Sequence, residues 1–187
     1  MILPVHIIGS SVLRKVAEDI TKDYPDLDKL IENMYETMYS SDGVGLAAPQ
    51  IGKSIRIFII DATPMAEEQP ELEGLKRTFI NAHITKRNGE MTQSNEGCLS
   101  IPDIREDVMR YPEITIEYVD ENFEKKTEHF EGIPAVIIQH EYDHLDGILF
   151  TDKVSALRKK FLKKKLSNIA KGYFTKRYKV VLGEKYK

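Results

Sequence analysis

The fold and the chemistry of this chain both centre on one stretch, Gln139-His-Glu-Tyr-Asp-His-Leu-Asp-Gly147. Pro134 stands just before it, where proline suits the first turn of a helix. Gly147 stands where a helix would end. The spacing therefore predicts a helix over residues 134–145 that carries most of the stretch.

Two histidines on this helix predict a metal site. His140 and His144 lie one turn apart on the same face, so both imidazoles reach one divalent metal. Glu141 follows directly and can handle protons from a water molecule at the open position of the metal. The alternative is a solvated helix face, but the chain has only 5 histidines and two of them fall in this pattern. We favour the metal site.

The third ligand is expected upstream of the helix. One metallopeptidase pattern continues to a third histidine, but Phe150 stands there and cannot ligate. The acidic residues Asp146 and Asp152 lie too close along the chain to complete the other common arrangement, and only Glu184 follows them. Cys98, in Asn95-Glu-Gly-Cys-Leu-Ser100, is then the candidate.

A lone cysteine has other interpretations. It is more often a small buried apolar residue than a ligand. Cys98 could also be a nucleophile paired with a histidine, but the His-Glu-His spacing would then be unexplained. One thiolate and two imidazoles leave a tetrahedral metal one position for water, which is typical of a catalytic site.

The remaining elements predict an α+β fold, because strands outnumber helices without alternating regularly with them. The sequence predicts a helix over 26–40, an exposed acidic loop over 62–76 and a helix over 153–171. Strands are expected at residues 55–60, 78–85, 113–120 and 125–130.

Composition excludes several classes of protein. The 187 residues suit one domain, and one cysteine cannot form an intrachain disulfide. The N-terminus has no basic residue before its apolar patch, and no apolar run approaches the ~18 residues of a membrane span. We expect a cytoplasmic protein with no membrane partner.

Charge is unevenly distributed. Residues 151–187 contain 13 basic and 2 acidic side chains, for a net charge of +11, whereas residues 1–150 carry −14. Such asymmetry points to a polyanionic partner. In the predicted C-terminal helix, one apolar stripe is expected from Val154, Leu157, Phe161, Leu162, Leu166 and Ile169, with lysines on the remaining surface.

Three segments resemble the signature motifs of the peptide deformylase family, in the family's order. They are Gly43-Val-Gly-Leu-Ala-Ala-Pro-Gln50, Glu96-Gly-Cys-Leu-Ser100 and Gln139-His-Glu-Tyr-Asp-His-Leu-Asp-Gly147. The resemblance implies antiparallel β-sheets around a central metal-binding helix, in one catalytic domain over 1–187 with a basic amphipathic helix and tail over 152–187. It also implies removal of the N-formyl group from the formyl-methionine of nascent polypeptides, with release of formate.

The resemblance also implies roles for individual residues. Cys98, His140 and His144 would hold the metal, whose hydroxide attacks the formyl carbon while Glu141 acts as general acid and base. Gln50 and the backbone N–H of Leu99 would stabilise the developing oxyanion. Gln50 could instead simply cap the glycine-rich loop. Substrate contacts are expected from Val44, Gly45, Glu96, Ile133, Val136 and Ile137. Each apolar member taken alone is more often simple core, and Gly45 and Glu96 could instead brace the site.

Metal identity does not follow from the ligand types, since zinc suits them well. The resemblance implies Fe(II), readily replaced by zinc, nickel or cobalt. It also implies that the basic C-terminal helix docks on the ribosome near the tunnel exit. Two other functions stay open: a general zinc peptidase, and a ribosome- or RNA-binding module with a structural metal.

Overall fold

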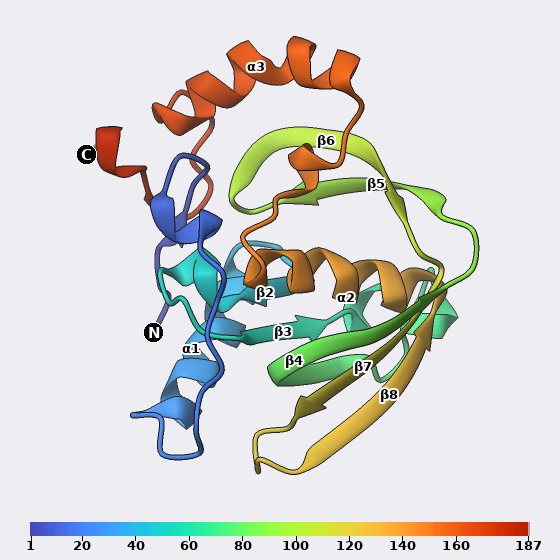
Figure 1. Ribbon diagram of the computed structural model, residues 1–187. Coiled ribbons are helices and arrows are strands. Elements are labelled where there is room, and N and C mark those ends of the chain that lie inside the picture. Colours follow the sequence, from blue (N-terminus) through green and yellow to red (C-terminus); the bar gives the residue numbers. More distant parts are fainter. Residues whose placement is uncertain (187) are drawn as a thin grey trace.

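Helix α2 (Gly132–Leu145) lies at the centre of the computed structural model, which describes residues 1–186. A five-stranded sheet covers one side of α2, and the hairpin of β5 (Thr92–Cys98) and β6 (Ile101–Arg110) covers the other (Figure 1). Ala135, Ile138 and Leu145 of α2 are fully buried in the core that they share with the sheet. The predicted α+β fold, with antiparallel sheets around a central helix, is confirmed.

The sheet has the strand order β2-β3-β4-β7-β8, and every neighbouring pair is antiparallel. Alternation explains its one-sided packing, because Ile114, Ile116 and Tyr118 of β7 point into the core while their neighbours do not. The four predicted strands all form, with bounds shifted by a few residues. The strands are β2 (Gly45–Ala47), β3 (Ile57–Asp61), β4 (Lys76–Asn88), β7 (Glu113–Val119) and β8 (Lys125–Glu131).

The β5–β6 hairpin was not expected from the sequence. Strand β6 does alternate between buried and exposed residues, but two of its inward positions are the charged Glu106 and Arg110. Charged residues at core positions hide the period of two that would have revealed the strand.

Helix α1 (Leu27–Ser40) confirms the predicted N-terminal helix. Its apolar stripe packs on the sheet face opposite to α2, within a second core cluster. The prediction that residues 62–76 form an exposed loop is wrong in part, because Leu72 and Leu75 are buried against the sheet. Two short 3₁₀ turns, Thr63–Met65 and Pro70–Leu72, bring these leucines inward.

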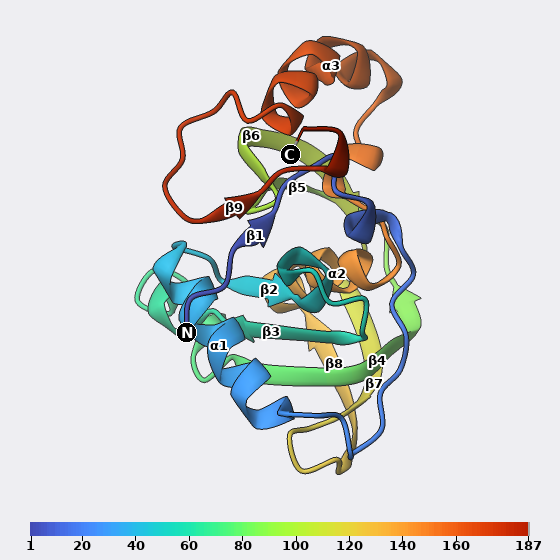
Figure 2. The ribbon, with the colours of Figure 1, turned by 90° about the vertical axis from the view of Figure 1, so that its left-hand side faces the viewer.

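The C-terminal segment packs on the hairpin rather than on the main sheet. Helix α3 (Ala156–Ala170) begins after Ser155, whose side chain accepts a hydrogen bond from the N–H of Arg158. Strand β9 (Val180–Val181) then pairs in parallel with β1 (Val5–His6), so these two strands lie side by side next to the hairpin (Figure 2).

The single apolar stripe predicted for α3 is wrong. Leu162 and Ile169 are buried on the hairpin, whereas Leu157 is 62% exposed and Phe161 is 68% exposed. Leu157 and Phe161 lie four residues apart and therefore share one face of the helix. This face is rotated away from the face that buries Leu162 and Ile169. None of the helices in residues 1–186 is both long and apolar enough to cross a membrane.

Candidate metal centre and active site

The structure brings Cys98, His140 and His144 together. Their ligand atoms all lie within 4.8 Å of one another, and Cys98 Sγ is 3.3 Å from Nε2 of His144. Cys98 ends β5, and the two histidines share one face of α2, with ring centroids 5.4 Å apart. The hairpin thus supplies the thiol, and the central helix supplies both imidazoles.

His140 is held by a buried network of charges. Its Nδ1 lies 2.8 Å from a carboxylate oxygen of Glu96, so Nε2 remains for a ligand. Arg110 donates two hydrogen bonds to Glu96 and a third, of 2.6 Å, to Asp143 of α2. Arg110 and Asp143 are not among the site residues predicted from the sequence, and no local pattern marks either of them for this role.

The charges of this network lower the pKa of Glu96. Burial raises this pKa, but the hydrogen bonds and charges of Arg110 and His140 outweigh burial and bring it to about 2. Glu96 is therefore an anion at neutral pH, and its oxygens are occupied by Arg110 and His140. The structure thus places Glu96 as a brace for His140.

His144 is suited to metal ligation. It is 1% exposed, and burial lowers its pKa well below the ordinary value, so the ring is neutral and keeps a lone pair. Among the described residues, Nδ1 of His144 has no hydrogen-bond partner.

Glu141 lies beside this cluster in a tightly enclosed position. Its Oε2 is buried and has no hydrogen-bond partner among residues 1–186. Burial raises the pKa of Glu141 to about 7. Gly45 makes room for it, since a Cβ at Gly45 would lie 2.5 Å from Glu141 Oε1. A buried acceptor with a raised pKa is what a general base near neutral pH requires.

Gln50 links the glycine-rich loop to the cysteine turn. Its Oε1 accepts a hydrogen bond of 2.8 Å from the N–H of Ala47, which is the capping role considered above. Its Nε2 points the other way, 3.3 Å from Ser100 Oγ and 3.5 Å from Cys98 Sγ. Gln50 therefore caps the loop and also presents an amide N–H at the cluster.

A cavity of about 260 Å³ holds some of the predicted substrate residues. Ile133 and Val136 of α2 line it, together with Thr92, Gln93 and Ser94 of β5, Pro112 and Gly132. Val44 and Ile137 do not line this cavity, and Ile137 packs against the main core instead. The lining of the cavity thus combines apolar side chains from α2 with polar side chains from β5.

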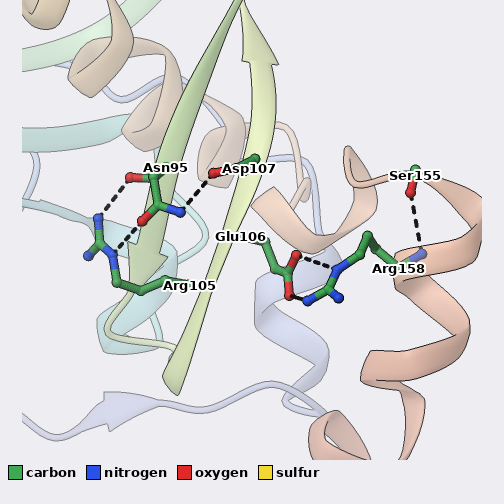
Figure 3. Close-up of a pocket in the computed structure, with 6 residues that line it drawn as sticks. All are labelled: Asn95, Arg105, Glu106, Asp107, Ser155 and Arg158. Carbon is green, nitrogen blue, oxygen red and sulfur yellow. Dashed lines mark hydrogen bonds and ion pairs between the residues drawn. The ribbon is translucent and has the colours of Figure 1, made fainter.

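A larger groove, of about 520 Å³, lies between the hairpin and the start of α3. Its polar and charged side chains form hydrogen bonds and one ion pair among themselves (Figure 3). Arg105 and Asp107 both bond to Asn95, and Arg158 of α3 donates to the carboxylate of Glu106, with Nε at 2.8 Å. The groove anchors α3 on β6 and contains no part of the Cys-His-His cluster.

Known proteins match this chain over most of its length. The family model described as polypeptide deformylase matches residues 2–160. A peptide deformylase of Flavobacterium psychrophilum is 57% identical over 189 residues, covering 97% of each chain. One of Salinibacter ruber is 40% identical over 185 residues, covering 97% of this chain and 95% of the relative.

Solved structures agree. A peptide deformylase from Legionella pneumophila superposes with a TM-score of 0.80 at 32% identity, covering 90% of this chain and 95% of the other. A peptide deformylase from Thermotoga maritima superposes with a TM-score of 0.75 at 39% identity, covering 83% of this chain and 99% of the other. With the motifs, the fold and the cluster in agreement, this chain belongs to the polypeptide deformylase family and removes the N-formyl group from nascent peptides.

Proposed function

We propose that Cys98, His140 and His144 hold one divalent metal ion, and that Glu141, Gln50 and the N–H of Leu99 act on the formyl group beside it. The observation that carries this assignment is the convergence of the three ligand atoms within 4.8 Å. The buried, unpartnered carboxylate oxygen of Glu141, the neighbour of His140 on α2, supports it. The thiol and two imidazoles, one of them oriented by Glu96, fit a metal with one remaining position for water.

A metal bound there supplies Lewis-acid activation of water and of the formyl oxygen. Glu141 takes one proton from the attacking water as its oxygen bonds to the formyl carbon. Glu141 then returns this proton to the peptide nitrogen as the carbon–nitrogen bond breaks. Formate and a free amine leave, and Glu141 is restored.

Gln50 and Leu99 stabilise the oxygen that becomes negative during this attack. Gln50 Nε2 makes two long hydrogen bonds, of 3.3 and 3.5 Å, which can be exchanged for a shorter one to the oxyanion. The N–H of Leu99 is the second donor. Each donor of this kind is worth about 3–4 kcal/mol in comparable sites.

The cavity beside α2 would receive the methionine side chain of the substrate. Ile133 and Val136 provide the apolar surface, and Val136 lies one turn before His140 on the helix. Val44 and Ile137 contribute less directly, since they are not among the residues that line this cavity. Gly45 contributes by making room for Glu141.

Fe(II) is the proposed native metal, with zinc, nickel or cobalt able to replace it. The ligand set accepts all four ions, and the family resemblance supports iron. Cys98 is only half-buried, so its thiolate is accessible to oxidants. The preparation should therefore lose activity in air.

The basic helix α3 is proposed to dock on the ribosome near the tunnel exit, in the cytoplasm. Lys159, Lys160, Lys163 and Lys164 are all exposed, and Leu157 and Phe161 project among them. Glu106 holds Arg158 and thereby fixes this helix on the hairpin. Ribosomal RNA phosphate at the exit complements this charge.

A paired assay tests the proposed function. Protein purified without oxygen is analysed for metal and assayed on a formyl-methionyl peptide and on the same peptide without the formyl group. We expect about one metal ion per chain, formate release from the first substrate and no cleavage of the second. Cleavage of the unformylated peptide would instead identify a general peptidase.

A further inference from the structure

The C-terminal segment of the chain reaches back to the active-site turn. The hydroxyl of Tyr178 donates a hydrogen bond of 2.6 Å to the backbone carbonyl of Leu99, 79 residues away. Residues 172–181, which we call the C-terminal strap, carry this tyrosine from α3 to β9 (Figure 2). Tyr178 follows the part of the chain that the family model matches, which ends at residue 160.

The strap is fixed on both sides of Tyr178. Phe174 and Val180 pack against the same buried core cluster that Cys98 packs against. Val5 donates a backbone hydrogen bond to the carbonyl of Lys179, next to Tyr178. The phenol is thus held at its position by neighbours on either side.

The turn that it contacts is a short link between β5 and β6. Cys98 pairs with Ile101, so Leu99 and Ser100 form the turn itself. The carbonyl of Ser100 accepts a hydrogen bond of 2.8 Å from the N–H of Ile8, and the carbonyl of Leu99 is bound by Tyr178. Both carbonyls of the turn are therefore held by groups from outside the hairpin.

We propose that Tyr178 is a positioning residue for deformylation, which orients the Leu99 N–H through its hydrogen bond to the Leu99 carbonyl. This inference rests on the proposed role of Leu99 as an oxyanion donor. The N–H and the carbonyl of Leu99 belong to adjacent rigid peptide planes, joined only by two soft torsions at its Cα. The hydrogen bond from Tyr178 fixes the peptide plane that contains the Leu99 carbonyl. The plane that contains the Leu99 N–H then has fewer orientations open to it.

The expected effect follows from this geometry. Loss of the phenol oxygen leaves the Leu99 carbonyl able to bond to water, because both residues are only half-buried. The stability of the protein should then change little. An oxyanion donor acts most strongly in the transition state, so its misalignment lowers kcat more than it changes KM.

Tyr178→Phe tests the proposal, because it removes one oxygen and keeps the packed ring. We expect kcat on a formyl-methionyl peptide to fall about 10-fold, less than the 10²–10³ for complete loss of a donor. KM should change less than about 2-fold, with metal content and melting temperature close to those of the parent. Tyr173→Phe is the matched control, since Tyr173 lies on the same strap and is 72% exposed, and its kcat should be unchanged.

A second readout follows the turn without catalysis. In zinc-loaded protein labelled with ¹⁵N-leucine, the Leu99 amide signal should shift and exchange faster in Tyr178→Phe than in Tyr173→Phe. Equal kcat values for the two variants, or an unchanged Leu99 signal, would overturn the inference. So would a loss of kcat that matches a loss of bound metal.

The variant Glu141→Ala separates this inference from the proposed function. If Glu141→Ala keeps normal turnover, the proposed roles around the metal fail. If Glu141→Ala loses turnover while Tyr178→Phe matches its control, only the role of Tyr178 fails.

Discussion

The carboxylate of Glu96 lies 2.8 Å from Nδ1 of His140, and Arg110 holds the same carboxylate from the other side. This contact sets the tautomer of the imidazole and turns its Nε2 toward Cys98 and His144. Partners of this kind fix the orientation of a metal-binding histidine and raise its basicity. The proposed ligand set thus depends on a buried ion pair contributed by the hairpin.

We expect the free energy of unfolding to depend on pH through the Glu96 carboxylate. The pKa of Glu96 is lowered from the ordinary 4.5 to about 2. The stabilisation that ionised Glu96 gives the folded protein is therefore complete above pH 4.5 and is lost as the pH falls toward 2. A difference of this size corresponds to about 3 kcal/mol. In urea unfolding of metal-free protein, Glu96→Gln should be destabilised at pH 6, and the gap to the parent should narrow by pH 3.

Glu90→Gln is the control for this measurement, because Glu90 is exposed on the loop before the same hairpin. Its unfolding free energy should follow that of the parent at both pH values. A gap between Glu96→Gln and the parent that stays constant from pH 6 to pH 3 would contradict the prediction.

We expect that removing any one of the three proposed metal ligands removes bound metal and activity together. Changing Cys98, His140 or His144 to alanine leaves two protein ligands, so each variant should purify with little bound metal and no measurable turnover. Metal analysis by mass spectrometry and a formate-release assay check this. Stoichiometric metal and near-normal turnover in Cys98→Ala would remove the thiol from the ligand set.

Glu141→Ala separates metal binding from proton transfer. The variant should keep its metal, because the carboxylate is assigned to proton transfer and not to ligation, yet turnover should fall by about 10²–10⁴. Glu141→Gln, which keeps the shape beside Gly45, should behave in the same way. A Glu141→Ala protein that purifies without metal would instead make Glu141 a ligand.

The basic helix α3 predicts salt-sensitive ribosome binding. Changing Lys159, Lys160, Lys163 and Lys164 to glutamate should abolish co-sedimentation with ribosomes at low salt, because lysine–phosphate contacts release counterions. Turnover on a short formyl peptide should stay nearly unchanged, since these side chains lie outside the metal cluster and the cavity beside α2.

A matched control keeps the same change of charge. Lys22, Lys53, Lys86 and Lys125 are exposed on the rest of the molecule, and their change to glutamate should leave co-sedimentation closer to that of the parent. Equal losses in the two variants would show that net charge, and not the helix, governs binding.

The features that depend on local geometry can be predicted from the amino-acid sequence alone. His140 and His144 fall one turn apart in any α-helix, and alternation marks β7 without reference to the rest of the fold. Cys98 followed from the need for a third ligand and from the resemblance of its motif. The convergence of Cys98, His140 and His144 was therefore predictable, because short-range periodicity and ligand chemistry specify most of it.

The features that depend on contacts between distant segments could not be predicted in this way, because they form only when the chain is folded. Arg110 and Tyr178 have no local pattern that announces a role, and each acquires one only when the hairpin packs against α2 and the strap packs against β1. The same is true of α3, where contact with the hairpin buries Leu162 and leaves Phe161 exposed. Periodicity shows on which face of a helix or strand a residue lies, but packing between distant segments decides what that face contacts.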